Sequence, residues 1–156
     1  MHAEPAVQLL TLRSTLVAVA DLDRSVAFYG ELGPFGVIVR EDGVAVLGDV
    51  SAGSAVLLLR ETPSLHHIRH GQQSLGLRSM TFNVGSLSEL DRIESVLRSR
   101  EGFTDRRHVG DSATELILGR DPDNLPVGFV CSANETDTIG PDYYRTIISL
   151  VYSMDA

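Results

Sequence analysis

The sequence contains no lysine, because all 13 of its basic residues are arginine. A Schiff-base mechanism that needs a lysine amine is therefore excluded. A single cysteine, Cys131, excludes an internal disulfide, and its apolar neighbours predict a small buried side chain rather than a nucleophile. Tryptophan is absent, and four tyrosines and five phenylalanines are the only aromatic residues, which argues against a ligand groove built by aromatic stacking.

Long apolar runs are also missing. The longest, such as residues 55–59, is far too short to span a bilayer, and the N-terminus has no basic-then-apolar pattern of a secretory signal. We therefore expect no membrane partner and a cytoplasmic location. The formal net charge of -8 argues against nucleic acid as a partner, since phosphate binding needs clustered cations, and it suits a cationic ligand.

The chain nevertheless has enough apolar residues for a packed core. It has 156 residues, 43% of them hydrophobic, which fits one domain of ordinary size. An internal repeat organises this domain: Leu12-Arg13-Ser14 recurs 65 positions later as Leu77-Arg78-Ser79. At the same offset, Ala20-Asp21-Leu22 becomes Gly85-Ser86-Leu87, which indicates one supersecondary unit used twice.

Each repeat predicts a strand, a helix and three further strands. In the first, alternation predicts a strand over residues 14–20, a helix capped by Asp21 or Asp23, and strands over residues 37–40, 44–47 and 55–60. In the second, the expected order is a strand over residues 80–84, a helix capped by Ser86 or Ser88, and strands over residues 103–109, 114–118 and 127–131. Glu41-Asp42-Gly43 has the chemistry of a hairpin turn.

These patterns predict an α+β fold with one module over about residues 10–61, a linker over 62–76, a second module over about 77–132 and a tail over 133–156. The last apolar segment, residues 143–152, fits a helix or a strand that docks on the body or on a second subunit. Its tyrosines can close a cavity if the tail folds over it, and otherwise they pack ordinarily.

Two segments resemble the vicinal-oxygen-chelate superfamily, which includes glyoxalases, bleomycin-resistance proteins and extradiol dioxygenases. Residues 19–29, VADLDRSVAFY, are similar to its first strand-to-helix junction, and residues 120–127, RDPDNLPV, are similar to its D-P-D-G-N-P turn. The resemblance covers roughly residues 10–132. It implies paired βαβββ modules whose curled mixed sheets form a cup, closed within one chain or across a homodimer, and a small-molecule ligand in that cup.

The resemblance also implies four metal-ligand positions. Counting from the two junction motifs places them at Ser14, at Val56 or Leu58, at Ser79 and at Gly128. Serine, an aliphatic side chain and glycine do not supply the carboxylate, imidazole or thiolate that a divalent cation needs. We therefore expect no metal and no other cofactor, although His66, His67 and His70 in the linker leave a relocated metal as an alternative to an ordinary solvated loop.

Strand alternation places the other candidate binding residues on one face. In each first strand, every second side chain should line the cup; these are Ser14, Leu16 and Ala18 in the first module and Ser79, Thr81 and Asn83 in the second. Together with Val56, Leu58 and Gly128 they would form a small, partly polar floor. The alternative is that the polar members only bond to nearby backbone.

Three further residues are candidates for acid–base chemistry. His108 and Asp111 can form a general base with its orienting carboxylate, and Glu115 is another possible acid or base. The alternative for His108 is an ordinary residue at a sheet edge beside a turn.

Three functions remain open on the sequence. The first is a metal-independent tailoring enzyme of bacterial secondary metabolism, such as an isomerase, cyclase or lyase involved in antibiotic biosynthesis. The second is a self-resistance protein that sequesters a drug or metabolite. The third is a dioxygenase or lyase with a relocated metal.

Overall fold

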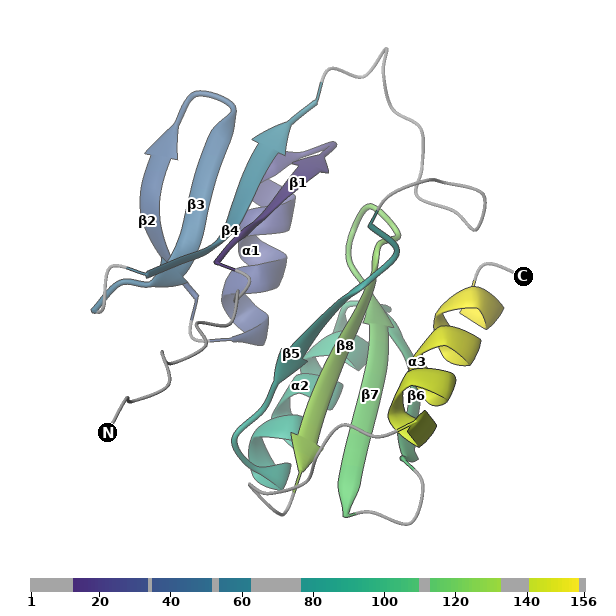
Figure 1. Ribbon diagram of the computed structural model, residues 1–156. Helices are drawn as coiled ribbons and strands as arrows, with labels where there is room; N and C mark the ends of the chain where they lie inside the picture. The colour runs from purple at the N-terminus through teal and green to yellow at the C-terminus, as the bar shows by residue number, and fades with distance from the viewer. Residues whose placement is uncertain are drawn as a thin grey trace, which may run out of the picture.

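The computed structural model consists of two similar units, each a four-stranded sheet with one helix against it (Figure 1). We call the unit from β1 to β4 module one and the unit from β5 to β8 module two. The residues that the structure describes are 13–33, 35–51, 54–62, 77–109, 113–132 and 141–154.

Module one contains five elements: β1 (Thr15–Val19), α1 (Leu22–Leu32), β2 (Gly36–Glu41), β3 (Val44–Asp49) and β4 (Ser54–Glu61). Its strands are ordered β1-β4-β3-β2. The pairing of β1 with β4 is parallel, and the other two pairings are antiparallel. The parallel pair follows from the order of elements, because α1 carries the chain back across the sheet after β1.

Module two repeats this arrangement with β5 (Met80–Asn83), α2 (Leu87–Ser99), β6 (Phe103–His108), β7 (Thr114–Arg120) and β8 (Pro126–Ser132). Its order is β5-β8-β7-β6, again with a parallel first pair. The expected α+β fold of two βαβββ modules with mixed sheets is therefore confirmed.

Equivalent residues begin the two module helices. The side chain of Asp21 accepts a hydrogen bond from the backbone N–H of Arg24, and the side chain of Ser86 accepts one from Glu89. Of the two capping residues expected for each helix, the first is thus the cap in both modules. Gly43 has a positive φ of 75° in the turn between β2 and β3, as the hairpin chemistry predicts.

One apolar core runs through both modules. Leu22, Phe28 and Leu32 of α1 belong to the same buried cluster as Leu90 and Leu97 of α2. Cys131 is also buried in this cluster, as its apolar neighbours predict. Because α1 and α2 share this cluster, the two helices lie on the same side of the sheets.

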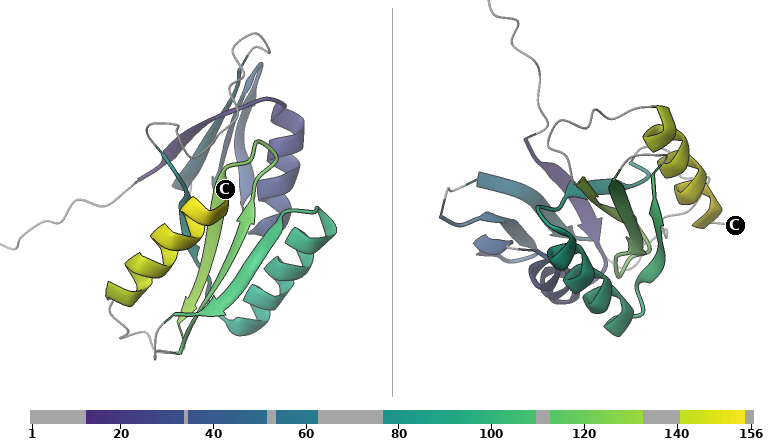
Figure 2. Two further views of the ribbon diagram at one scale, coloured as in Figure 1. Left: turned by 90° about the vertical axis from the view of Figure 1, so that its right-hand side faces the viewer. Right: turned by 90° about the horizontal axis from the view of Figure 1, so that it is seen from below.

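A third helix, α3 (Pro141–Met154), ends the described chain. It lies on the side of the sheets opposite to α1 and α2 (Figure 2). The tail is therefore a helix that docks on the body, which was one of the alternatives that its sequence left open. Among the described residues, no helix combines the length and apolarity needed to cross a membrane.

Candidate ligand-binding face

The two motifs that carry the family resemblance contact each other between the modules. The Tyr29 hydroxyl, from the first motif, donates to Asp121 Oδ2 of the second over 2.7 Å, and both residues are buried. Asp121 Oδ1 also accepts from the backbone N–H groups of Asp123 and Leu125 at 2.9 and 2.8 Å. The sequence indicated both motifs but not this contact, because nothing local in either segment shows its partner.

Burial is the largest influence on the pKa values of Tyr29 and Asp121, the two residues of this contact. It raises the pKa of the Tyr29 hydroxyl well above its usual value, and the Asp121 charge adds to that rise. Burial also raises the pKa of Asp121, against the opposing effect of its three hydrogen-bond donors. The turn itself needs a left-handed residue, and Asn124, with a φ of 72°, stands where the family pattern has glycine.

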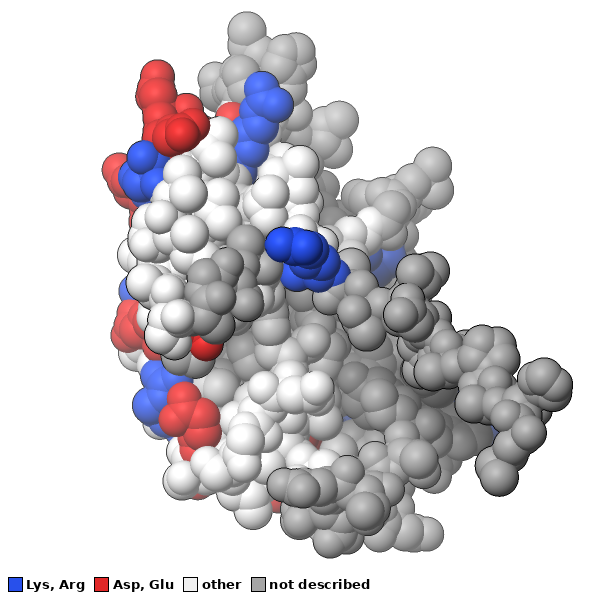
Figure 3. All heavy atoms as spheres, turned by 60° about the vertical axis from the view of Figure 1, so that its left-hand side comes forward, with Lys and Arg blue, Asp and Glu red and all other residues white. Residues whose placement is uncertain are grey.

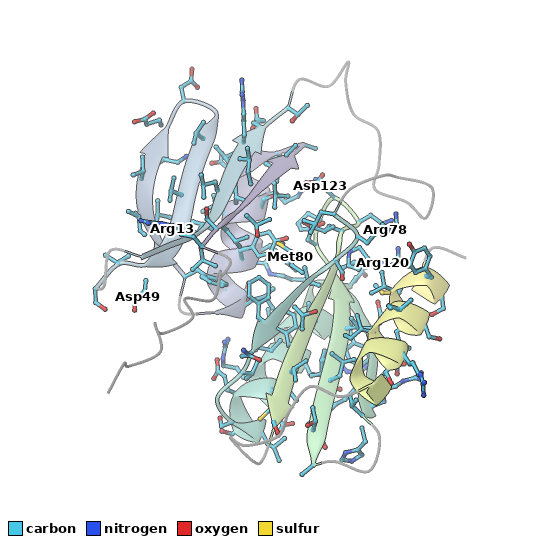
Figure 4. All side chains as sticks on the ribbon, in the orientation of Figure 1. Arg13, Asp49, Arg78, Met80, Arg120 and Asp123 are labelled. Carbon is cyan, nitrogen blue, oxygen red and sulfur yellow. The ribbon has the colours of Figure 1, made fainter. Side chains whose placement is uncertain are left out.

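Asp123 adds a second link in the same turn. It accepts from the backbone N–H of Ala20 at 3.2 Å and pairs with Arg24 at 3.1 Å. It thereby ties module two to the start of α1 (Figure 4). These contacts hold the two sheets in a fixed relation.

Strand register assigns each side chain of module one to the helix side or to the open side of its sheet. Val17 and Val19 are buried on the helix side, whereas Leu16 is 65% exposed. Leu16 begins a row across all four strands, in which each residue is the lateral partner of the next: Leu16, Leu58, Val46 and Val39. We call these four residues the apolar row. No helix of the described chain packs on it.

The surface of module one agrees with this assignment. In a view that brings the β2 side of the molecule forward, most charged side chains lie along one margin, and the largely uncharged area beside them contains basic side chains but no visible acidic cluster (Figure 3). Arg40 of β2 belongs to the helix side, where it pairs with Asp23 of α1. Pairing with the helix keeps this charge away from the apolar row.

The equivalent row of module two is different. Thr81, Gly128 and Leu118 are lateral partners on β5, β8 and β7. A Cβ at Gly128 would lie 3.1 Å from Thr81 Oγ1, so the glycine leaves a shallow floor beside the threonine. Thr81 and Asn83 are exposed, whereas Ser14 and Ser79 are half-buried.

The C-terminal helix covers the remaining part of that face. Leu150 and Met154 of α3 form a buried cluster with Leu116 and Leu118 of β7, against which Val130 of β8 also packs. The β5–β8 strip with Thr81 and Gly128 lies beside the part of this face that α3 covers. This position of α3 corresponds to the alternative, left open by the sequence, in which the tail folds over the body.

Register also resolves the metal-ligand positions that the family resemblance implies. Leu16 and Thr81 are equivalent in the repeat, and they pair with Leu58 and Gly128 respectively. Leu58, and not Val56, therefore matches Gly128. With Ser14 and Ser79 the four positions offer two hydroxyls and no charged donor, so these residues do not fit a divalent metal.

The described ranges contain no cluster of three or more His, Cys, Asp or Glu side chains that could hold an ion elsewhere. The linker histidines His66, His67 and His70, which carried the alternative of a relocated metal, lie outside the described residues.

The candidate acid–base residues lie on the other side of module two. His108 and Glu115 are lateral partners, with 3.5 Å between Nε2 and Oε1. They share the side of Ile117, which faces the common core, whereas Leu116 and Leu118 face α3. The sheet therefore separates His108 and Glu115 from Thr81, and Asp111 lies outside the described residues.

Glu115 belongs to an ion-pair network centred on Arg106. The guanidinium donates to Glu115 Oε2 at 3.0 Å through Nε, and to Asp91 and Glu94 of α2 at 2.7 Å through Nη1. Hydrogen bonds to Glu94, Glu115 and Asp91 raise the pKa of Arg106, and the Arg106 bond is the main cause that lowers the pKa of Glu94. The arrangement of these charges joins β6 and β7 to α2.

Replacing Arg106 with methionine should therefore weaken the attachment of α2. We expect the free energy of unfolding to fall by about 1–2 kcal/mol, because the ion pairs are partly exposed and screened. Chemical denaturation at neutral pH measures the change. Arg107→Met is the matched control, since among the described residues Arg107 pairs within its own strand, with Asp105; equal losses for the two variants would show that the network has no special role.

Known proteins resemble this chain in structure more than in sequence. No family model matches the chain, and no curated protein matches it. Among solved structures, a glyoxylase/bleomycin resistance protein/dioxygenase domain from Frankia sp. EAN1pec superposes with a TM-score of 0.65 at 24% identity, over 80% of this chain and 99% of that one. The chain has the vicinal-oxygen-chelate fold.

Two further structures with the vicinal-oxygen-chelate fold are similar. The fosfomycin resistance protein FosX from Listeria monocytogenes gives a TM-score of 0.60 at 16% identity, over 82% of this chain and 98% of that one. Lactoylglutathione lyase from Agrobacterium tumefaciens gives 0.55 at 19%, over 78% and 92%. At these identities the likeness establishes the fold, and function has to be argued from the site.

Proposed function

We propose that this protein binds a small organic molecule on the open face of its sheets, without a metal at the four positions where the vicinal-oxygen-chelate fold usually carries one. The observation that carries the proposal is the uncovered apolar row of module one. Leu16 and Val39, at the two ends of this row, are 65% and 39% exposed, and a contiguous exposed apolar surface is typical of a binding site. Thr81 and Asn83 supply a hydroxyl and an amide on the matching face of module two.

Sequestration is the form of this function that the geometry favours. The acid–base candidates His108 and Glu115 lie across the sheet from Thr81, and Glu115 is occupied by Arg106. Besides the exposed Arg60, which lies on the same side of β4 as Leu58, the described part of the open face offers apolar contact and neutral hydrogen bonding more than proton transfer. A drug- or metabolite-binding role, in the cytoplasm and as a homodimer in which a second copy closes the cup, fits these features.

A metal-independent tailoring reaction is the second candidate. The exposed Thr81 hydroxyl and Asn83 amide support it, because fixed polar groups beside an apolar surface can orient and polarise a substrate. Conversion of the bound molecule into a product would distinguish this role from sequestration.

Two matched fluorescent probes test the binding proposal. N-phenyl-1-naphthylamine is neutral and apolar, and 8-anilinonaphthalene-1-sulfonate adds one sulfonate to the same rings. In the presence of excess EDTA we expect saturable binding of the neutral probe at one site per chain, unchanged when zinc replaces the chelator. Binding that appears only with added divalent metal, or no saturable binding, would contradict the proposal.

A further inference from the structure

The two modules differ in what covers their open faces, although their strands correspond residue by residue. Leu118 of β7 is equivalent to Val46 of β3, since each is the lateral partner of an equivalent residue, Gly128 or Leu58. Leu118 is 1% exposed beneath α3, whereas Val46 is only half-buried. Thus α3 covers, on module two, the surface whose equivalent on module one is open.

Among the described side chains of α3, Leu150 and Met154 are buried against β7, Ile147 packs beside them, and Val151 is also buried. Ile148 and Tyr152 remain 58% and 43% exposed. A helix held on one narrow face, with apolar side chains left on another, can separate from the sheet without unfolding the module core.

An arginine fixes the last turn of α3. Arg120, at the end of β7, donates to the backbone carbonyl of Met154 and to Asn124 Oδ1, the latter at 2.6 Å. The Arg78 guanidinium lies 5.2 Å from the ring centroid of Tyr152 in the same turn. Both arginines lie close to the C-terminal half of α3 (Figure 4). Cations at this position stabilise the helix, because they interact favourably with the negative end of its dipole.

A carbonyl is a weak partner for a guanidinium. It carries a partial charge, whereas a carboxylate or sulfonate carries a full one and can accept two parallel N–H bonds. Arg78 and Arg120 bring two positive charges to this site, although the net charge of -8 by itself suits a cationic ligand. An acidic group at Arg120 would replace the contact that holds the end of α3.

We propose that α3 occupies a second ligand subsite, on the open face of module two, which takes an apolar molecule with one acidic group on Arg120. The apolar part of that molecule replaces Leu150 and Met154 on Leu116 and Leu118, and α3 leaves as it binds. This inference rests on the proposed binding function. Only the form with α3 detached binds a ligand at this subsite. The apparent affinity of the subsite is therefore its intrinsic affinity multiplied by the fraction of chains in that form.

The test loosens α3 in the full chain. Leu150→Ser with Met154→Ser should tighten binding of 8-anilinonaphthalene-1-sulfonate by about tenfold or more, because the detached fraction rises. The neutral N-phenyl-1-naphthylamine should gain less. Adding Arg120→Gln to the loosened chain should remove the extra affinity for the sulfonate and leave the neutral probe unchanged. Ile148→Ser, at an exposed position of the same helix, is the control and should change neither affinity.

Equal sulfonate affinity in the wild type and the loosened chain would overturn the inference. An equal gain for both probes that Arg120→Gln does not affect would also overturn it, since that result reports exposed apolar surface only. The binding function would stand in either case if the wild type still binds the neutral probe. If neither probe binds to any variant, the binding function and the subsite both fail.

A measurement on the wild type keeps the test independent of how well the variants fold. Saturating 8-anilinonaphthalene-1-sulfonate should accelerate hydrogen exchange of the amides in residues 141–154, while α2 keeps its protection. Unchanged or stronger protection of α3 in the presence of the sulfonate would contradict displacement.

Discussion

Asp121→Ala is expected to lower the free energy of unfolding by about 3 kcal/mol, and the melting temperature by about 6–12 °C for a chain of this size. The carboxylate is 5% exposed and accepts hydrogen bonds from Tyr29, Asp123 and Leu125. Alanine leaves the Tyr29 hydroxyl, which is fully buried, without its acceptor. Thermal and denaturant unfolding, followed by circular dichroism, measure the loss.

Asp123→Ala provides the matched control in the same turn. Its side chain is partly exposed and pairs with an exposed arginine, Arg24, so we expect a loss of about 1 kcal/mol or less. Equal losses for Asp121 and Asp123 would show that the buried joint with Tyr29 does not hold the modules together.

The raised pKa of Asp121 makes the stability of the wild type depend on pH in a way that a variant without this carboxyl group lacks. Between the ordinary aspartate pKa of about 3.9 and the higher folded value, the folded state binds more protons than the unfolded state. The contribution of Asp121 to stability therefore falls as pH rises through that window, opposite to the lowered pKa of Glu94. Asp121→Asn should remove the Asp121 contribution, so its stability should rise more steeply with pH there than that of the wild type.

Leu16→Glu is expected to weaken binding of N-phenyl-1-naphthylamine by about 10- to 100-fold, since an apolar ligand would lose a leucine contact and meet a charge. Leu16 is the most exposed member of the apolar row, so the substitution should leave the melting temperature nearly unchanged. Fluorescence titration in EDTA measures the affinity.

Leu87→Glu is the control, because Leu87 is also an exposed leucine, at 46%, but lies at the first turn of α2 on the opposite side of the sheets. The two variants change the net charge equally. Similar affinities for Leu16→Glu and Leu87→Glu would place the probe away from the apolar row.

The sequence predicted those parts of the fold that depend on local chemistry. A short acceptor side chain just before a segment with helical spacing favours a helix start, so Asp21 and Ser86 could be named among two candidate caps for each helix. Strand alternation likewise placed Leu16 and Thr81 on the open side, because β1 and β5 each have one covered face.

The parts that depend on docking between distant segments could not be predicted. Leu116, Ile117 and Leu118 of β7 are all buried, because α3 covers one face and the common core covers the other. A strand buried on both sides loses its period of two, so the sequence could not give the direction of Glu115. Once α3 is in place, register assigns Glu115 to the side of Arg106.

Chemical-shift mapping of backbone amides tests most directly whether this chain binds an organic molecule on its open face without the usual metal. Uniformly labelled protein would be titrated with N-phenyl-1-naphthylamine in EDTA. We expect the largest shifts in β1, β4 and β5, at Leu16, Leu58 and Thr81. Largest shifts at His108 and Glu115 on the opposite side, or shifts that appear only after a divalent metal is added, would contradict the account.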